Sequence, residues 1–268
     1  MDRSTLAGRV TGTYMLINVK TLIGFKLNSL DGEIGKVKEF YFDDQHWTIR
    51  YLVADTGNWL TGRQVLVSPY SFEGISKTDE LFSIGLTKKQ IEDGPSIEAH
   101  VPISRQFEES YHGYYGLPMY WGGPYMWGTE PFIIKDQEES KEQIYRERTW
   151  DSHLRSSAEV TNYDILASDG SIGHVSDFIL DLETWAIRYL VVDTGKLWPG
   201  KKVLIAPKWI KHVSWTGQSV LLDLSQEAVK SAPEYDKETI PNRDYEQDLH
   251  QYYSREGYWV NDLLVKRA

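Results

Sequence analysis

The sequence contains no cysteine among its 268 residues. This absence excludes disulfide scaffolds, thiolate nucleophiles and cysteine-ligated metal sites, and it is typical of a reducing compartment, so we expect a cytoplasmic location. The chain also lacks an apolar run of about 20 residues, the length that crosses a bilayer. Residues 1–18 lack the charged and then apolar pattern of a signal peptide. We therefore expect a soluble protein without a transmembrane segment.

Positive charge is in deficit. The chain carries 29 Lys and Arg residues against 39 Asp and Glu residues, which gives a net charge of −10. An acidic surface repels a phosphate backbone instead of releasing its counterions. Nucleic acid is therefore not expected as a partner. Aromatic residues are abundant instead, with 10 Trp and 17 Tyr, and such rings fill cores or populate contact surfaces.

The chain is an internal duplication with an offset of 138 residues. The run DGEIGKV at residues 31–37 recurs as DGSIGHV at residues 169–175. The same offset relates IRYLV at residues 49–53 to residues 187–191, and DTG at residues 55–57 to residues 193–195. Such ungapped identity at one offset is the signature of repeated structural units.

The match extends beyond the globular part into an aromatic arm that follows each copy. The matched arm positions are Phe107, Glu108, His112, Tyr114, Tyr115, Tyr120 and Trp121 in the first copy and Tyr245, Glu246, His250, Tyr252, Tyr253, Tyr258 and Trp259 in the second. We predict a first domain at residues 1–100, an arm and charged linker at 101–157, a second domain at 158–232 and a C-terminal arm at 233–268.

Turn and strand signals predict a mainly all-β fold class. Asp31-Gly32 predicts a tight hairpin before the alternating run 34–42, and the alternation from Trp47 to Val53 predicts a strand with one apolar face. Another short strand is expected to stop at Pro69, and Thr87 to Gln90 reads as a capping box that opens a brief helix. Strands this short and closely spaced predict a small antiparallel barrel or sandwich in each copy and leave no room for a parallel α/β sheet.

Together, Asp-Gly-x-Ile-Gly-x-Val, Ile-Arg-Tyr-Leu-Val, the Asp-Thr-Gly loop and the Val-Leu pair before Pro69 and Pro207 resemble the PRC-barrel family. That family includes the cytoplasmic domain of the photosynthetic reaction centre H subunit and the C-terminal barrel of the ribosome maturation factor RimM. The resemblance, closest to bacterial proteins with two such domains, covers residues 22–259 and implies a small curved β-barrel with a short helical, aromatic-rich arm in each copy. The chain lacks the H subunit's membrane helix and RimM's N-terminal domain.

Two Asp-Thr-Gly motifs in a duplicated β protein raise the alternative of an aspartic protease, in which two carboxylates share a proton. Asn58-Trp59 and Lys196-Leu197 follow the motifs instead of the small residues that support such a dyad. We therefore interpret Asp55 and Asp193 as turn residues whose side chains accept hydrogen bonds from the loop backbone.

Other chemistry-bearing patterns are sparse. His112 and His250 occupy equivalent arm positions, but the histidines show no metal-ligand spacing, so neither a metal nor a cofactor is expected and no residue is assigned as catalytic. Arg50 and Arg188 lie within predicted strands. Both could bind an anion, although pairing with an acidic residue on a neighbouring strand is the favoured interpretation.

The arms and the loops after Asp-Thr-Gly are the candidate interaction surface, because Tyr and Trp are favoured at contacts between proteins. The candidate residues are Trp59, Trp198, Tyr111, Tyr114, Tyr115, Tyr120, Trp121, Tyr252, Tyr253, Tyr258 and Trp259. An arm that packs back on a domain to fill an apolar groove is the alternative. We expect a pseudo-twofold pair of domains whose arms embrace the opposite copy, with further homo-oligomerisation left open.

The sequence thus predicts a non-catalytic protein-binding or scaffolding protein whose protein partner is unidentified, a membrane complex being one candidate. The alternative is an accessory protein of a photosynthetic or electron-transport membrane complex, by analogy with the H subunit. A hydrolase that uses the two Asp-Thr-Gly motifs is the remote alternative.

Overall fold

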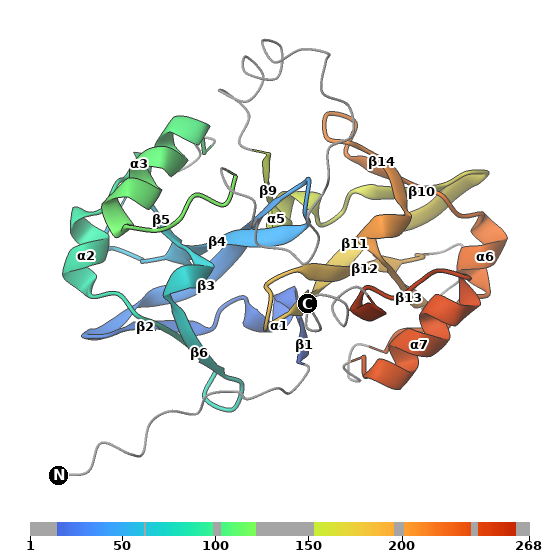
Figure 1. Ribbon diagram of the computed structural model, residues 1–268, viewed down its shortest axis with the longest axis horizontal. Helices are drawn as coiled ribbons and strands as arrows, with labels where there is room; N and C mark the ends of the chain where they lie inside the picture. Colours follow the sequence, from blue (N-terminus) through green and yellow to red (C-terminus); the bar gives the residue numbers. More distant parts are fainter. Residues whose placement is uncertain are drawn as a thin grey trace.

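The computed structural model describes residues 15–61, 63–98, 103–121, 153–195, 201–236 and 241–260. The fold is mainly β, with one mixed sheet centred on each copy of the repeat and short helices at the outer ends (Figure 1). The linker between residues 122 and 152 and the predicted surface residue Trp198 lie outside the described residues.

The first sheet has the strand order β6-β7-β2-β3-β4-β5-β8. Its elements are β2 (Lys26–Ser29), β3 (Gly32–Asp43), β4 (Thr48–Asp55), β5 (Arg63–Val67), the 3-10 turn η1 (Pro69–Ser71), β6 (Phe72–Ser76), β7 (Leu81–Ile84), α2 (Lys88–Asp93), β8 (Ile97–Glu98) and α3 (Arg105–Tyr115). The predicted turn at Asp31-Gly32, the stop at Pro69 and the capping box of Thr87 with Gln90 are all confirmed.

The second sheet has the equivalent order β13-β12-β11-β10-β15-β14. Its elements are β10 (Asp164–Ala167), β11 (Gly170–Asp181), β12 (Ile187–Asp193), β13 (Lys202–Ile205), η2 (Pro207–Trp209), β14 (Ile210–Ser214), β15 (Ser219–Leu222), α6 (Gln226–Lys230) and α7 (Arg243–Tyr252). Ser225 caps α6 as expected, because its side chain accepts a hydrogen bond from the Ala228 backbone.

The prediction of purely antiparallel strands is wrong for one pair in each sheet. Residues 26–28 of β2 pair parallel with residues 81–83 of β7, and β10 pairs parallel with β15 in the same way. Strand β7 forms an antiparallel hairpin with β6 and lies beside β2 in the same direction. Within the described residues, neither sheet closes by pairing its two end strands.

The segments that precede the two copies exchange places. Strand β1 (Leu16–Asn18) comes before the first copy but pairs antiparallel with β11 of the second. Strand β9 (Leu154–Ser156) comes before the second copy but pairs with β3 of the first. Short helices α1 (Val19–Leu22) and α5 (Ser157–Val160) continue these segments. The end of the predicted linker, residues 154–157, is therefore a structural element of the opposite copy.

The two copies also meet at a pseudo-twofold axis in the centre of the molecule, where the beginnings of β4 and β12 come together (Figure 1). Thr48 and Ala186, which differ by the repeat offset, form an antiparallel bridge. The Trp185 ring of the second copy packs against Phe72 and Phe82 of the first, with ring centroids 4.6 and 5.9 Å away. One continuous core contains buried residues from both copies.

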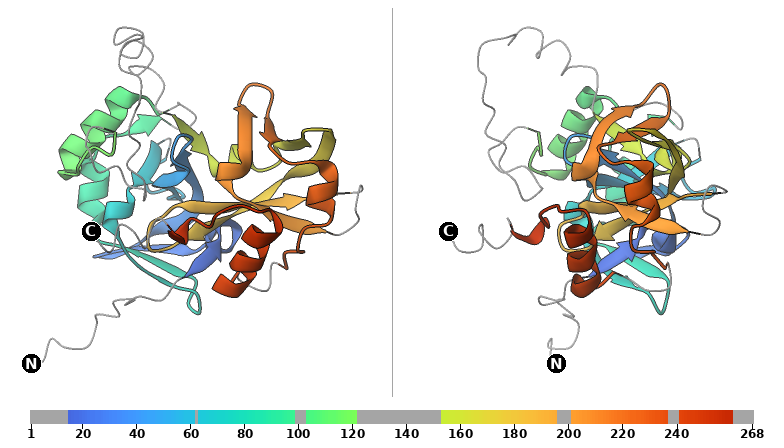
Figure 2. Two further views of the ribbon diagram at one scale, coloured as in Figure 1. Left: turned by 45° about the vertical axis from the view of Figure 1, so that its right-hand side comes forward. Right: turned by 90° about the vertical axis from the view of Figure 1, so that its right-hand side faces the viewer.

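The expectation that the aromatic arms embrace the opposite copy is wrong. Helix α3 packs on the first sheet and α7 on the second, so the two helices lie at opposite ends of the molecule (Figures 1 and 2). In the first copy, Tyr111 of the arm packs with Tyr51, Val53 and Leu66 of its own sheet. The segments at residues 16–22 and 154–160, which we call the leading segments, cross over instead.

Candidate functional site

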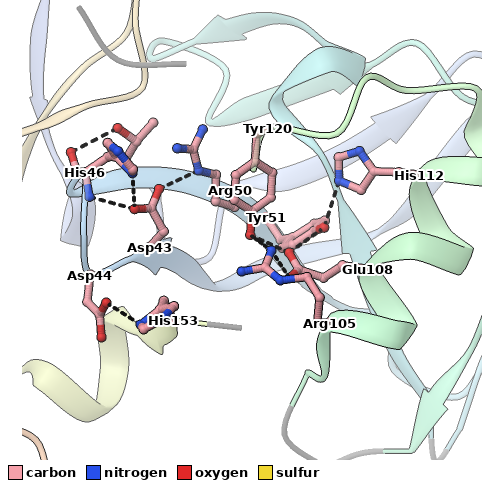
Figure 3. Close-up of polar contacts among 11 residues, drawn as sticks. Asp43, Asp44, His46, Arg50, Tyr51, Arg105, Glu108, His112, Tyr120 and His153 are labelled. Atoms are coloured by element: carbon pink, nitrogen blue, oxygen red, sulfur yellow. Dashed lines mark hydrogen bonds and ion pairs between the residues drawn. The ribbon is translucent and has the colours of Figure 1, made fainter. Parts of the chain in front are cut away.

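A buried polar network joins each arm helix to its sheet. Tyr51 on β4 has its hydroxyl 3.0 Å from Oε1 of Glu108 and 3.0 Å from Nε2 of His112 (Figure 3). Glu108 and His112 are four residues apart on α3 and therefore share one face of the helix. Arg105 donates to Oε2 of Glu108 at 2.8 Å, and the Tyr120 hydroxyl donates to Oε1. The Glu108 side chain has no exposed surface.

The pattern of hydrogen-bond donors and acceptors favours an uncharged Glu108. Nδ1 of His112 lies 2.9 Å from the carbonyl oxygen of Pro118, which can only accept, so Nδ1 carries a proton and Nε2 accepts from Tyr51 in the neutral ring. A protonated Glu108 can then donate to the Tyr51 oxygen and complete the chain. Burial raises the pKa of Glu108 to about 7 against the opposing charge of Arg105. Burial also lowers the pKa of His112.

A second buried pair anchors the arm from the other side. Nε of Arg50 donates to Oδ2 of Asp43 on the neighbouring strand at 2.6 Å, which confirms the predicted acidic partner. Burial raises the pKa of Asp43, but hydrogen bonds from His46 and the charge of Arg50 outweigh it and leave that pKa below its usual value. The Arg50 guanidinium lies 4.1 Å from the centre of the Tyr120 ring.

A β-bulge places Arg50 and Tyr51 in these roles. Tyr41 pairs with Tyr51, whereas Phe42 pairs with Ile49, so Arg50 is the extra residue on β4. Bulges re-aim side chains. The prediction of a single apolar face for this strand is therefore wrong: Leu52 faces the main core, while Tyr51 faces the arm, and both are buried.

The second copy repeats the network at the offset of 138, except that Thr184 replaces His46. The Tyr189 hydroxyl lies 2.8 Å from Oε1 of Glu246 and 3.0 Å from Nε2 of His250. Arg188 donates to Asp181 at 2.6 Å, which confirms the acidic partner predicted for this arginine as well. The remaining pairs are Arg243 with Glu246, Tyr258 with Glu246, Arg188 over Tyr258 and Arg243 over Trp259. Both copies thus use one design to dock an arm.

The network has little room for a substrate. The hollow beside Arg50, His112 and Tyr120 measures about 10 Å³, which is about the volume needed for a single water. Glu108 itself is fully buried. An arrangement of acid, phenol and imidazole could transfer protons, but here these groups satisfy one another. Its chemistry is that of a preorganised, hydrogen-bonded clamp between helix and sheet.

The Asp-Thr-Gly motifs form turns, as the sequence indicates. Oδ1 of Asp55 accepts from the Gly57 backbone at 3.0 Å, and Oδ1 of Asp193 accepts from Gly195 at 2.8 Å. Strands β4 and β12 run in opposite directions from the bridge at Thr48 and Ala186. At ~3.3 Å per residue, the two carboxylates are roughly 40 Å apart. They cannot share a proton, so the geometry opposes the protease alternative.

The glycines of Asp-Gly-x-Ile-Gly are explained by the same loop. A Cβ atom on Gly35 would lie 2.0 Å from the Asp55 carbonyl oxygen, and Gly173 has the same relation to Asp193. Both glycines have positive φ angles, 140° and 157°. Two motifs that are separate in sequence are therefore one packing contact in space. Among the described residues, no group of three His, Cys, Asp or Glu side chains is placed to hold a metal ion.

The aromatic candidates divide between interior and surface. Tyr111, Tyr120 and Tyr253 are buried, so they cannot belong to an accessible contact surface. The partly exposed candidates are Trp59, Tyr115, Trp121, Tyr258 and Trp259, of which Trp121 and Trp259 stack under Arg105 and Arg243. Tyr114 is 46% exposed and Tyr252 is 39% exposed. Most of the aromatic surface of the arms thus packs against their own sheets. This agrees with the alternative interpretation, in which an arm packs back on a domain.

Sequence reasoning missed Arg105, Glu108 and Asp43 as members of a site. The available signal was the identity of charged residues at equivalent arm positions, Arg105 with Arg243 and Glu108 with Glu246, on the helical face that also carries Tyr111 and His112. Charged residues on a helix face are usually solvated, so this pattern alone favours exposure.

Comparison with known proteins yields neither a matching protein-family model nor a matching curated protein. In the described part of the chain, the helices are too short or too polar to cross a membrane.

Proposed function

We propose that this protein is a non-catalytic cytoplasmic scaffold, built from two PRC-barrel repeats, that binds another protein through equivalent surfaces on its two copies. The sequence motifs carry the family assignment. Support for a curved barrel in each copy comes from β3 and β11, whose pairings with β4 and β12 each shift register at two equivalent places. Such bulges bend and twist a strand.

The equivalence of Tyr114 and Tyr252 carries the proposal. Among the described members of the predicted surface, these tyrosines are the most exposed, and they are related by the repeat offset. Each hydroxyl donates to a backbone carbonyl of the preceding helix, Tyr114 to Gln90 at 3.3 Å and Tyr252 to Ala228 at 2.8 Å. A ring held in this way loses little further conformational freedom on binding. The protein therefore presents an equivalent, anchored tyrosine ring on the surface of each copy.

The exchanged leading segments and the shared core fix the relative position of these two rings. A partner with two matching sites gains from the second contact without a further loss of translational freedom, and such linkage raises overall affinity by about 10²- to 10⁴-fold. Bivalent recognition by a twofold-symmetric or repeated partner is the expected mode.

The test is affinity capture from the native host with mass spectrometry, with and without detergent-solubilised membranes. We expect a stoichiometric partner that the unmodified protein and a Leu30→Ala control retain, because Leu30 is an exposed apolar residue in the turn between β2 and β3, outside the arms. A single Tyr114→Ala change should weaken capture and the Tyr114→Ala/Tyr252→Ala pair should abolish it. Equal capture by the double variant would disprove the surface, and the absence of any stoichiometric partner would disprove the scaffold. A partner found only with solubilised membranes would instead identify an accessory role at a membrane complex.

A further inference from the structure

A hollow of about 360 Å³ lies where the first leading segment meets the second sheet. Lys20 and Thr21 of α1 line one side, and Asp177 of β11 and Lys202 of β13 line the other. Asn18 and Tyr235 contribute the remaining polar walls. The hollow exists because the leading segment crosses between copies, so both copies are needed to form it. Its volume falls in the range of about 300–1,000 Å³ typical of small-molecule sites.

The floor of this hollow is a fixed chain of buried polar groups. The Tyr235 hydroxyl donates to Oδ1 of Asn18 at 2.9 Å, and Nδ2 of Asn18 donates to Oδ2 of Asp177 at 3.1 Å. Oδ1 of Asp177 accepts from the backbone of Lys20 at 3.1 Å and of Phe178 at 2.8 Å. Because the Asp177 carboxylate already accepts three hydrogen bonds, it serves as a strut that holds α1 against β11.

The rim supplies two ammonium groups from opposite copies. Lys20 reaches the hollow from α1 and Lys202 from the edge strand β13. Nζ of Lys202 lies 4.0 Å from Oδ2 of Asp193, which is the outer limit of an ion pair. A weak, partly exposed pair of this kind contributes little. The two lysines outnumber Asp177, the one acidic residue of the lining, and so favour an anion, since ammonium groups bind phosphate strongly as point charges.

The opposite end of the pseudo-twofold axis provides the comparison. The positions equivalent to Lys20 and Lys202 are Ala158 and Gln64, and Glu39 occupies the place of Asp177 and is contacted by Ser156. Lys20 and Lys202 are therefore both specific to the end of the molecule that α1, β11 and β13 form.

We propose that this hollow binds a small organic phosphate, with the phosphate group between the ammonium groups of Lys20 and Lys202 and the organic part against Asn18 and Tyr235. A free phosphate ion shares the charge chemistry but fills only a small part of the volume. The bound molecule contacts both copies, so it also strengthens their association.

The test is calorimetric titration at low salt with two probes, inorganic phosphate and ribose 5-phosphate. We expect saturable binding of ribose 5-phosphate that weakens about tenfold in Lys20→Met and in Lys202→Met, since each removes one charge-assisted contact. Lys38→Met is the matched control, because Lys38 is an exposed lysine at the position equivalent to Ser176, at the other end. Its affinity should stay within about twofold.

Tighter binding of the sugar phosphate than of inorganic phosphate assigns the site to an organic ligand, whereas equal affinity overturns that part of the proposal and leaves a site for the free ion. Binding should also weaken as ionic strength rises. The proposed site is wrong if neither probe binds at concentrations on the order of millimolar. It is also wrong if both lysine variants bind ribose 5-phosphate with unchanged affinity.

Discussion

Replacing Glu108 with Gln tests the buried network through the pH dependence of stability. The pKa of Glu108 rises from 4.5 to about 7 because burial disfavours its charged form. Between pH ~4.5 and ~7, the folded protein keeps a proton on Glu108 that the unfolded chain has released. The contribution of this group to stability is therefore fully present below pH ~4.5 and is lost as the pH rises through ~7. A shift of this size corresponds to about 3 kcal/mol.

Glutamine cannot ionise, so the variant should lack this slope. At pH ~5 the variant is expected to be less stable than the unmodified protein, because the amide nitrogen that replaces Oε1 can donate to Tyr51 but cannot accept the hydrogen bond from Tyr120. Toward pH ~8 the difference should shrink by about 3 kcal/mol. Burial lowers the pKa of His112, which opposes this trend by destabilising the fold at acidic pH, but His112 is present in both proteins.

The assay is urea unfolding followed by tryptophan fluorescence at half-unit steps between pH ~5 and ~8, with the change in free energy taken from the transition midpoint. Glu109→Gln is the matched control, because its side chain is the exposed neighbour on the same helix. Parallel pH profiles for Glu108→Gln and the unmodified protein would refute the inference that Glu108 is protonated in the folded state at acidic and near-neutral pH.

Three further changes probe the fold. Gly35→Ala should lower the free energy of unfolding in urea by about 3 kcal/mol, since a Cβ atom there would lie 2.0 Å from a carbonyl oxygen. Gly113→Ala is the control, because there is open space around its Cβ position, and it should stabilise α3 by about 0.5–1 kcal/mol. Equal effects of the two changes would contradict both expectations. Trp185→Ala should destabilise both copies together by about 3–5 kcal/mol, visible as one shifted calorimetric transition, and two separate transitions would contradict the shared core. A fragment of residues 153–268 should form a dimer, because its leading segment pairs with a strand of another copy and not of its own. Light scattering measures the mass of the fragment, and a stable monomer would contradict the exchange.

Local signals in the sequence accounted for the elements of each copy. The turn at Asp31-Gly32, the stop at Pro69 and the capping box at Thr87 act over two to four residues, so a single sequence reveals them. The repeat offset likewise predicted which contacts would occur twice. Arg50 and Arg188 then paired with acids on the neighbouring strand, as strand arginines commonly do.

The location of the aromatic rings needed more than composition. Tyr111 and Tyr114 lie in one helix with the same side-chain chemistry, yet the first is buried and the second is 46% exposed. Which helix face meets the sheet depends on Tyr51, and its direction depends on the bulge at Arg50. That bulge interrupts the alternation on which the expected apolar face of the strand was based.

The sequence by itself determined the duplication, the mainly β character and the turns, because these are set by repeated identity and by backbone preferences of neighbouring residues. Tertiary structure alone decided the parallel pairing of β2 with β7, the exchange of β1 and β9, and the hollow between Lys20 and Lys202. Each of these joins segments far apart in the chain. A three-residue strand such as Leu16–Asn18 carries no pattern of its own, and only the free edge of β11 in the assembled fold determines where it lies.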